Sequence, residues 1–144
     1  MRLFSQDTKV EALKRAPLFE GLSKKELAQL ARVSEDMEIP KGQVLTKEGE
    51  IGHEFFVIVE GETEVTKNGK RVAKRGGGDF IGEIALIEET PRTATVTAKT
   101  ALRVFVLTRT DFRYLLEENP KVQGKVMRAL ARRVAELSGD PAVA

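Results

Sequence analysis

The sequence predicts an α+β protein in which an antiparallel β-roll, of the double-stranded jelly-roll kind, lies between N-terminal and C-terminal helices. Apolar residues recur at helical spacing near both ends of the chain, and short β-branched runs punctuated by glycines fill the middle. No repeat or linker divides the chain. We therefore expect one domain over 1–144, with helices at about 5–35, the roll at 37–108 and helices at 110–137.

The N-terminal region is predicted to contain two helical segments. Apolar residues at helical spacing precede Pro17, which stops the first segment. Ser23 and Glu26 have the spacing of a capping box, which marks the start of the second. An apolar stripe follows them at i, i+3 and i+4, and it indicates a helix with one buried face: Leu27, Leu30 and Ala31.

The middle region reads as strands. Residues 55–59 form a continuous apolar run of strand length, which predicts a strand buried on both faces. Asn68-Gly69 lies between two strand-like runs and predicts a hairpin with a type I′ turn. Two further strands are expected within 93–107. We interpret Gly76-Gly77-Gly78 as a flexible connection between strands, and His53 as an exposed residue of a polar turn.

Two helices are expected at the C-terminal end. Thr110 is the predicted N-cap of the first, and Asn119-Pro120 separates it from a last helix over about 121–137. Met127 is assigned to helix packing. The apolar face of the last helix consists of Val122, Val126, Leu130, Val134 and Leu137. Its basic residues are read as a solvated face, with a partner protein, an anionic membrane or nucleic acid as open alternatives: Lys121, Lys125, Arg128 and Arg132.

Composition excludes several functions. The chain has no cysteine and one histidine, which argues against thiolate metal sites, histidine-rich metal sites and most nucleophilic chemistry, so we expect no enzyme. The net charge of +2 predicts no general affinity for nucleic acid. No apolar run approaches the ~20 residues of a membrane span, and the N-terminus lacks the apolar core of a signal peptide. A cytoplasmic protein is the expectation.

One segment, residues 78–95, departs from ordinary strand-and-turn composition. Gly82 lets the backbone approach a ligand closely, and a helical turn over 83–86 would present free N–H groups to an anion. The guanidinium of Arg92 can bind two oxygens of a phosphate. Glu83 would then accept a hydrogen bond from a sugar hydroxyl. Together these groups predict a site for a nucleotide that carries few phosphates.

The same segment resembles a known binding motif. Gly82-Glu83-Ile84-Ala85-Leu86 and Pro91-Arg92-Thr93-Ala94-Thr95 are similar to the phosphate-binding cassette of the cyclic nucleotide-binding domains, the family of catabolite activator protein, protein kinase A regulatory subunits and cyclic-nucleotide-gated channels. The resemblance extends over about 17–137, and includes glycines between the strands: Gly42, Gly49 and Gly61.

The resemblance implies a role for each candidate residue. Arg92 would pair with the exocyclic phosphate oxygens, which would also accept hydrogen bonds from backbone N–H groups near Ala85 and Thr93. Glu83 and the backbone of Gly82 would hold the ribose 2′-hydroxyl. The apolar walls are expected from three residues: Ile84, Val72 and Ala94. Leu86 completes the cassette turn.

The family resemblance also implies a ligand and a mode of action. The expected ligand is cAMP, with cGMP as the alternative because the Thr93 hydroxyl suits either nucleotide. The last helix would move on binding and act as a lid over the base. No aromatic residue follows Tyr114, so the base would be covered by Arg132 or Arg133. The alternative is a vestigial pocket on a constitutive protein-interaction module.

The expected output follows from what comes after the last helix. No helix-turn-helix follows it, so we expect no DNA-binding domain. Signalling would then pass to an effector protein in trans, or to a second copy that meets the stripe of Val122, Val126 and Leu130.

Overall fold

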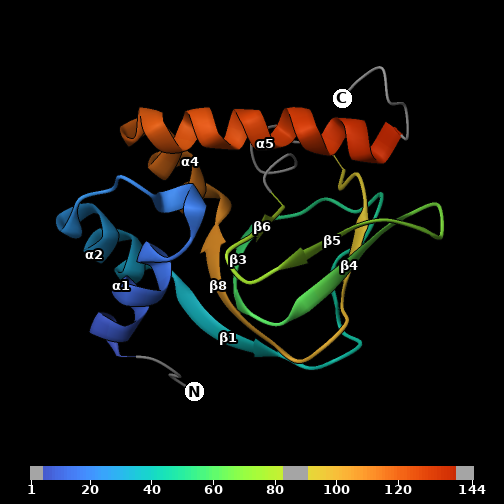
Figure 1. Cartoon of the computed structure of the whole chain (residues 1–144), viewed down its shortest axis with the longest axis horizontal. Coiled ribbons are helices and arrows are strands. Elements are labelled where there is room, and N and C mark those ends of the chain that lie inside the picture. Colours follow the sequence, from blue (N-terminus) through green and yellow to red (C-terminus); the bar gives the residue numbers. More distant parts are fainter. Residues whose placement is uncertain (1–4, 83–90, 139–144) are drawn as a thin grey trace.

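Two four-stranded sheets pack face to face, and helices from both ends of the chain cover the outer face of one of them (Figure 1). This computed structural model describes residues 5–82 and 91–138, without the side chains of 130 and 133–138. The predicted α+β roll is confirmed. The helices are α1 (Gln6–Lys14), the 3₁₀ helix η1 (Pro17–Phe19), α2 (Lys24–Val33), α4 (Arg109–Glu118) and α5 (Pro120–Ser138). The strands are β1 (Glu35–Ile39), β2 (Val44–Thr46), β3 (Glu54–Glu60), β4 (Glu62–Lys67), β5 (Lys70–Gly76), β6 (Phe80–Ile81), β7 (Thr95–Ala98) and β8 (Leu102–Thr108).

The first sheet, in the order β1-β8-β3-β6, is buried on both faces. Successive side chains of a strand point to opposite faces. In β3, Phe55 and Val57 join the core beneath the helices, whereas Phe56 and Ile58 join the core between the two sheets. Strand β8 alternates between the same two cores. The continuous apolar run of β3 therefore forms the doubly buried strand that the sequence predicts.

The second sheet, in the order β2-β7-β4-β5, ends in the predicted hairpin. Asn68 has φ of 53° and Gly69 has φ of 79°, so both central residues have the positive φ of a type I′ turn. The hairpin register shifts by a bulge between Val65 and Thr66. Strand β5 is the edge of this sheet.

The helix starts agree with the sequence at one end of the chain and differ at the other. Ser23 and Glu26 form the predicted capping box, and the pKa of Glu26 is lowered mainly because its carboxylate accepts a hydrogen bond from the Ser23 backbone N–H. Helix α4, however, is capped by Thr108 and not by Thr110. The Thr108 hydroxyl accepts a hydrogen bond from the backbone N–H of Asp111 at 3.2 Å, and the helix therefore starts two residues earlier than predicted.

The glycine run between β5 and β6 is a close-packed bend, so its interpretation as a flexible connection was wrong. A Cβ atom on Gly77 would lie 2.9 Å from the carbonyl oxygen of Val59. Gly78 has φ of 93°, and its backbone N–H donates to the carbonyl of Ile58 at 2.7 Å. A Cβ atom on Gly78 would lie 3.3 Å from Cδ of Pro17. Small size is required here for contact between β3, the bend and η1.

A pair of aromatic rings fastens α4 to the first sheet. Phe112 of α4 and Phe55 of β3 are fully buried, and their ring centroids lie 4.1 Å apart at an interplanar angle of 22°. Stacked aromatic side chains contribute both apolar burial and a favourable ring–ring interaction. The position of α4 is therefore tied to β3.

We expect Phe112→Ala to lower the free energy of unfolding by about 3–5 kcal/mol, because it leaves a cavity between α4 and β3. Tyr114→Ala on the same helix is the matched control, since Tyr114 is 63% exposed and should change stability by less than about 0.5 kcal/mol. Chemical denaturation measures both values. Equal losses in the two variants would show that the ring pair does not fasten α4.

Candidate functional site

Arg92 is a buried cation held by backbone carbonyl groups. Its side chain is 7% exposed. Nη1 donates to the carbonyl of Gly82 at 2.9 Å, and Nη2 donates to the carbonyl of Glu54 at 2.7 Å. Gly82 directly follows β6 and Glu54 begins β3, so two neighbouring strands orient the guanidinium. The carbonyls fix its direction and carry no net charge themselves.

Two glycines make room for this side chain. A Cβ atom on Gly52 would overlap Nε, Cζ and Nη2 of Arg92. A Cβ atom on Gly82 would overlap Nη1 of Arg92 and lie 2.8 Å from the Glu54 carbonyl oxygen. Gly82 also has φ of 95°, which disfavours any side chain. The guanidinium therefore packs directly against backbone at both positions.

The backbone of Arg92 is fixed as firmly as its side chain. Its N–H donates to the carbonyl of Glu50 at 2.8 Å, and its carbonyl accepts from the N–H of Gly49 at 2.9 Å. Close by, the N–H of Glu48, one residue before Gly49, donates at 3.0 Å to the hydroxyl of Thr95, three residues after Arg92. The turn before β3 therefore runs beside the segment that carries Arg92, and together they form a preorganised setting for the cation.

The structure brings several predicted site residues together. Gly82 lies against Arg92, and Thr93 follows it as a half-buried residue. The predicted wall residues Val72 and Ala94 pack in the same apolar cluster between the two sheets, Ala94 as a buried member and Val72 at its margin. The remaining cassette residues lie outside the described residues: Glu83, Ile84, Ala85 and Leu86.

Two contributors were missed by the sequence reading. Neither Gly52 nor Glu54 was singled out, and Glu54 acts only through its backbone carbonyl. No local pattern marks either role. Only the fold shows that Gly52 must lack a side chain to admit Arg92.

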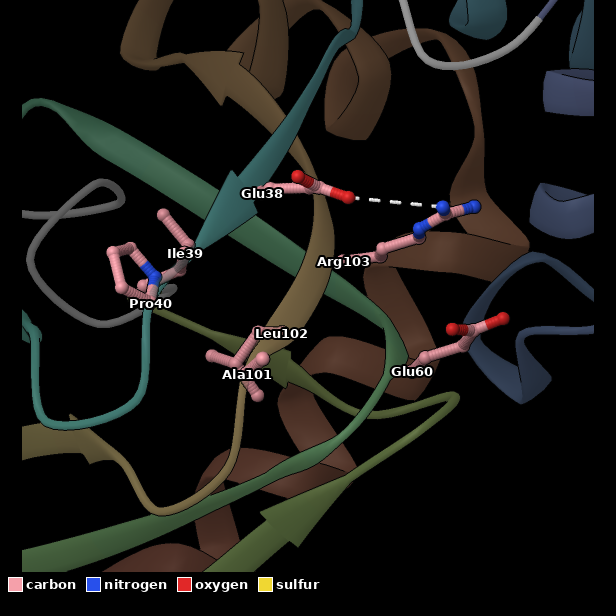
Figure 2. A pocket seen from close by; sticks show the side chains of 7 residues that line it. All are labelled: Glu38, Ile39, Pro40, Glu60, Ala101, Leu102 and Arg103. Carbon is pink, nitrogen blue, oxygen red and sulfur yellow. Dashed lines mark ion pairs between the residues drawn. The ribbon is translucent and has the colours of Figure 1, made fainter.

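A separate cavity of about 490 Å³ opens between β1, β3 and β8 and contains none of the candidate residues (Figure 2). An ion pair between Glu38 and Arg103, 3.7 Å apart, lies at its edge. It is therefore distinct from the site around Arg92. Its lining consists of Glu38, Ile39, Pro40, Glu60, Ala101, Leu102 and Arg103.

Helix α5 is joined to the N-terminal region by a lysine. Nζ of Lys125 donates to the carbonyls of Pro17 at 2.9 Å and Glu20 at 2.8 Å. The interpretation of Lys125 as part of a solvated basic face is thereby corrected, because the first residue of η1 and the residue that follows this helix offer carbonyl groups to the cation. Arg132, a predicted lid residue, is exposed, and the side chain of Arg133 lies outside the description.

Two other predictions about α5 also change. Val122 and Val126 are fully buried in the core beneath the helices, so they do not offer a free stripe to a second copy. A dimer through them would require α5 to leave that core. Met127 is 63% exposed and does not pack inside the protein.

Of the described helices, none is both long and apolar enough to cross a bilayer.

Comparison with known proteins identifies the family to which this fold and site belong. The family sequence model described as "Cyclic nucleotide-binding domain" matches residues 36–119, which include β3, Gly82 and Arg92. The chain belongs to the cyclic nucleotide-binding domain family. The resemblance inferred from the cassette is confirmed.

Individual relatives agree with this assignment. The cAMP-dependent protein kinase regulatory subunit of Schizosaccharomyces pombe is 38% identical over 105 residues, which cover 72% of this chain and 26% of that protein. The solved structure of cAMP-bound PfPKA-R superposes with a TM-score of 0.86 at 25% identity, over 96% of this chain and 49% of that one. The chain spans about a quarter of the length of the curated kinase regulatory subunits it matches.

Two structural relatives, from Trypanosoma brucei and Trypanosoma cruzi, are described as regulatory subunits of a cAMP-independent kinase. The subunit from Trypanosoma brucei has a TM-score of 0.79 and 29% identity, over 86% of this chain and 45% of that one. A variant of that subunit is described as bound to cAMP, and its three substitutions include a threonine-to-arginine change.

We expect Gly52→Ala to lower the free energy of unfolding by about 1–3 kcal/mol, because the added methyl group overlaps the Arg92 guanidinium. In an Arg92→Ala background the same substitution should cost less than about 0.5 kcal/mol, since the overlapping group is gone. A denaturation double-mutant cycle measures the difference. Additive losses would contradict the packing of Arg92 on Gly52.

Proposed function

We propose that this domain is a receptor for cAMP. The observation that carries the proposal is the buried Arg92 guanidinium, which two backbone carbonyls orient beside Gly82 at the start of the cassette segment. A guanidinium can bind two oxygens of a phosphate with two parallel hydrogen bonds. Because its orientation is set before the ligand arrives, little ordering is needed on binding.

The other candidate residues supply the rest of a nucleotide site. Backbone N–H groups near Ala85 and Thr93 would share the phosphate, and Glu83 would accept from the ribose 2′-hydroxyl. Val72, Ile84 and Ala94 would line the apolar side. Of these, Val72 and Ala94 already lie in one cluster, which supports a common wall.

The choice of cAMP over cGMP rests on the relatives. Kinase regulatory subunits named for cAMP match most of this chain, and PfPKA-R is solved with cAMP bound. Thr93 suits either nucleotide, so cGMP is the alternative ligand. The chemistry proposed is binding without catalysis, which agrees with regulatory relatives.

A second candidate function is a domain that does not respond to cAMP. This alternative is supported by a relative of the same fold, which is described as the regulatory subunit of a cAMP-independent kinase. A variant of that relative with three substitutions is described as bound to cAMP, so a domain of this fold takes the nucleotide when its side chains suit it. The primary proposal is therefore cAMP binding.

We expect Arg92→Ala to weaken cAMP binding by about 2–5 kcal/mol, because it removes a buried charge that pairs with the phosphate. Arg92→Lys should give an intermediate loss, since lysine keeps the charge but not the two-pronged geometry. Isothermal calorimetry measures both affinities.

Arg103→Ala is the matched control, because Arg103 is another partly buried arginine and lines the separate cavity. Its cAMP affinity should equal that of the wild type. Thermal melts without ligand separate a folding defect from a binding defect. A loss below threefold for Arg92→Ala in a folded protein would contradict the role of Arg92.

We further propose that binding repositions the C-terminal helices. Arg92 is bonded to the carbonyl of Glu54, and Glu54 pairs with Thr108 on the neighbouring strand. Thr108 is the N-cap of α4, so Glu54 links the Arg92 cation to the start of the C-terminal helices. A ligand that pulls on Arg92 more strongly in one helix position shifts the population toward that position.

An effector protein in trans would read the position of α5, and the exposed residues of this helix suit such a contact. Met127, Arg128 and Arg132 are exposed, whereas Val122 and Val126 of the apolar stripe are buried. We therefore favour an effector protein over a second copy bound through Val122 and Val126.

We expect cAMP to shift the distance distribution between spin labels at Lys99→Cys and Ala131→Cys. Both positions are exposed, and the chain has no native cysteine to label by mistake. Lys99 follows β7 in the roll and Ala131 lies on α5. Double electron–electron resonance measures the distance distribution with and without ligand. A pair within the roll, Lys47→Cys and Lys99→Cys, should not change. An unchanged Lys99–Ala131 distribution at saturating cAMP would contradict the movement while leaving binding intact.

A further inference from the structure

The β4–β5 hairpin concentrates positive charge. Between residues 67 and 75 the sequence contains five basic residues and no acidic one. Lys70, Arg71 and Lys74 are exposed on β5, while Lys67 and Arg75 are half-buried. The whole chain has a net charge of only +2, so the hairpin is a local excess of charge.

The charge next to the turn does not serve the stability of the hairpin. Lys67 and Lys70 lie directly opposite each other next to the turn, and like charges in that arrangement are destabilising. Among the residues that the structure describes, no ion pair is formed by Lys67, Lys70 or Arg71. Lysines on an edge strand do discourage pairing with other chains, which accounts for part of β5. It does not account for Lys67, which lies on the inner strand β4.

The hairpin is joined to the setting of Arg92 through one residue. The Asn68 N–H at its tip donates to Oε1 of Glu48 at 3.0 Å. The Glu48 N–H in turn donates to the Thr95 hydroxyl, three residues after Arg92. In the middle of β5, Val72 packs in the same cluster as Ala94. Four of the five basic residues therefore lie on the same strand as Val72, which contributes to the proposed nucleotide site.

We propose that the basic residues of this hairpin steer the anionic cyclic nucleotide into the site. This inference rests on the proposed function and deepens it. A cluster of one sign of charge beside a binding site raises the local concentration of oppositely charged ligand and so raises the association rate constant. Because the effect acts at a distance through solvent, salt screens it, with a Debye length of about 10 Å at 0.1 M. The hairpin acts before contact, so the dissociation rate constant is independent of it.

The test is stopped-flow association of a fluorescent cAMP analogue at several salt concentrations. Lys70→Gln/Arg71→Gln removes two exposed charges from the hairpin. Lys24→Gln/Lys25→Gln is the matched control, since it removes two exposed charges from α2, on the other side of the molecule in Figure 1. Glu64→Gln should have the opposite effect on the association rate constant. It removes a negative charge that lies opposite Lys74 in the hairpin.

At about 20 mM ionic strength, the hairpin variant should lower the association rate constant about threefold, and at about 0.5 M the change should fall below about 1.3-fold. Glu64→Gln should raise the constant by about 1.5-fold at low salt. The control should match the wild type, and all dissociation rate constants should agree within about twofold.

Several results overturn the proposal. One is an association rate constant that the hairpin variant leaves unchanged at low salt, or that the α2 control lowers equally. Another is faster dissociation at every salt concentration, which would make these residues direct ligand contacts. Binding of a single-stranded oligonucleotide that is lost in the hairpin variant, with unchanged cAMP association, would assign the surface to nucleic acid. If the wild type binds no nucleotide, the proposed function itself fails; salt-independent wild-type association refutes steering alone.

Discussion

A buried guanidinium held by main-chain carbonyl groups is the interaction on which the site depends. Burying a cation is costly unless polar groups satisfy it, and here carbonyls at the start of β3 and just after β6 do so. Those carbonyls belong to the backbone of the roll, so the direction of Arg92 is set by the fold. The absence of side chains at Gly52 and Gly82 follows from the same constraint.

The doubly buried first sheet connects this cation to the helices. Strand β3 presents alternate residues to the two cores, and its first residue both accepts a hydrogen bond from Arg92 and pairs with the N-cap of α4. A second connection between the site and the helices starts at the glycine bend before β6. The glycine bend packs near Pro17, and the carbonyls of Pro17 and Glu20 accept hydrogen bonds from Lys125 of α5. Both C-terminal helices are therefore in contact with elements that hold the site.

Much of this architecture could be predicted because its signals are local. A continuous apolar run predicted the doubly buried strand, Asn68-Gly69 predicted the type I′ turn, and Ser23 with Glu26 predicted the capping box. The cassette residues identified the family. Each of these patterns reflects a constraint between neighbours in the sequence.

The features that could not be predicted depend on contacts between distant segments. The sequence shows a glycine at position 52 but not the arginine that crosses it. It shows the helical spacing of basic residues in α5 but not the η1 carbonyls that capture Lys125. The start of α4 was misplaced for a different reason: Thr108 and Thr110 both suit an N-cap, and only the strand end decides between them.

The central claim is that a preoriented cation recognises a cyclic phosphate. The most direct test compares the affinities of the wild-type protein for cAMP and for adenosine by calorimetry, because the two ligands share a base and a ribose and differ in the phosphate. A charge-assisted contact of about 2–5 kcal/mol predicts that cAMP binds at least about 30-fold more tightly. Equal affinities for the two ligands would contradict the account.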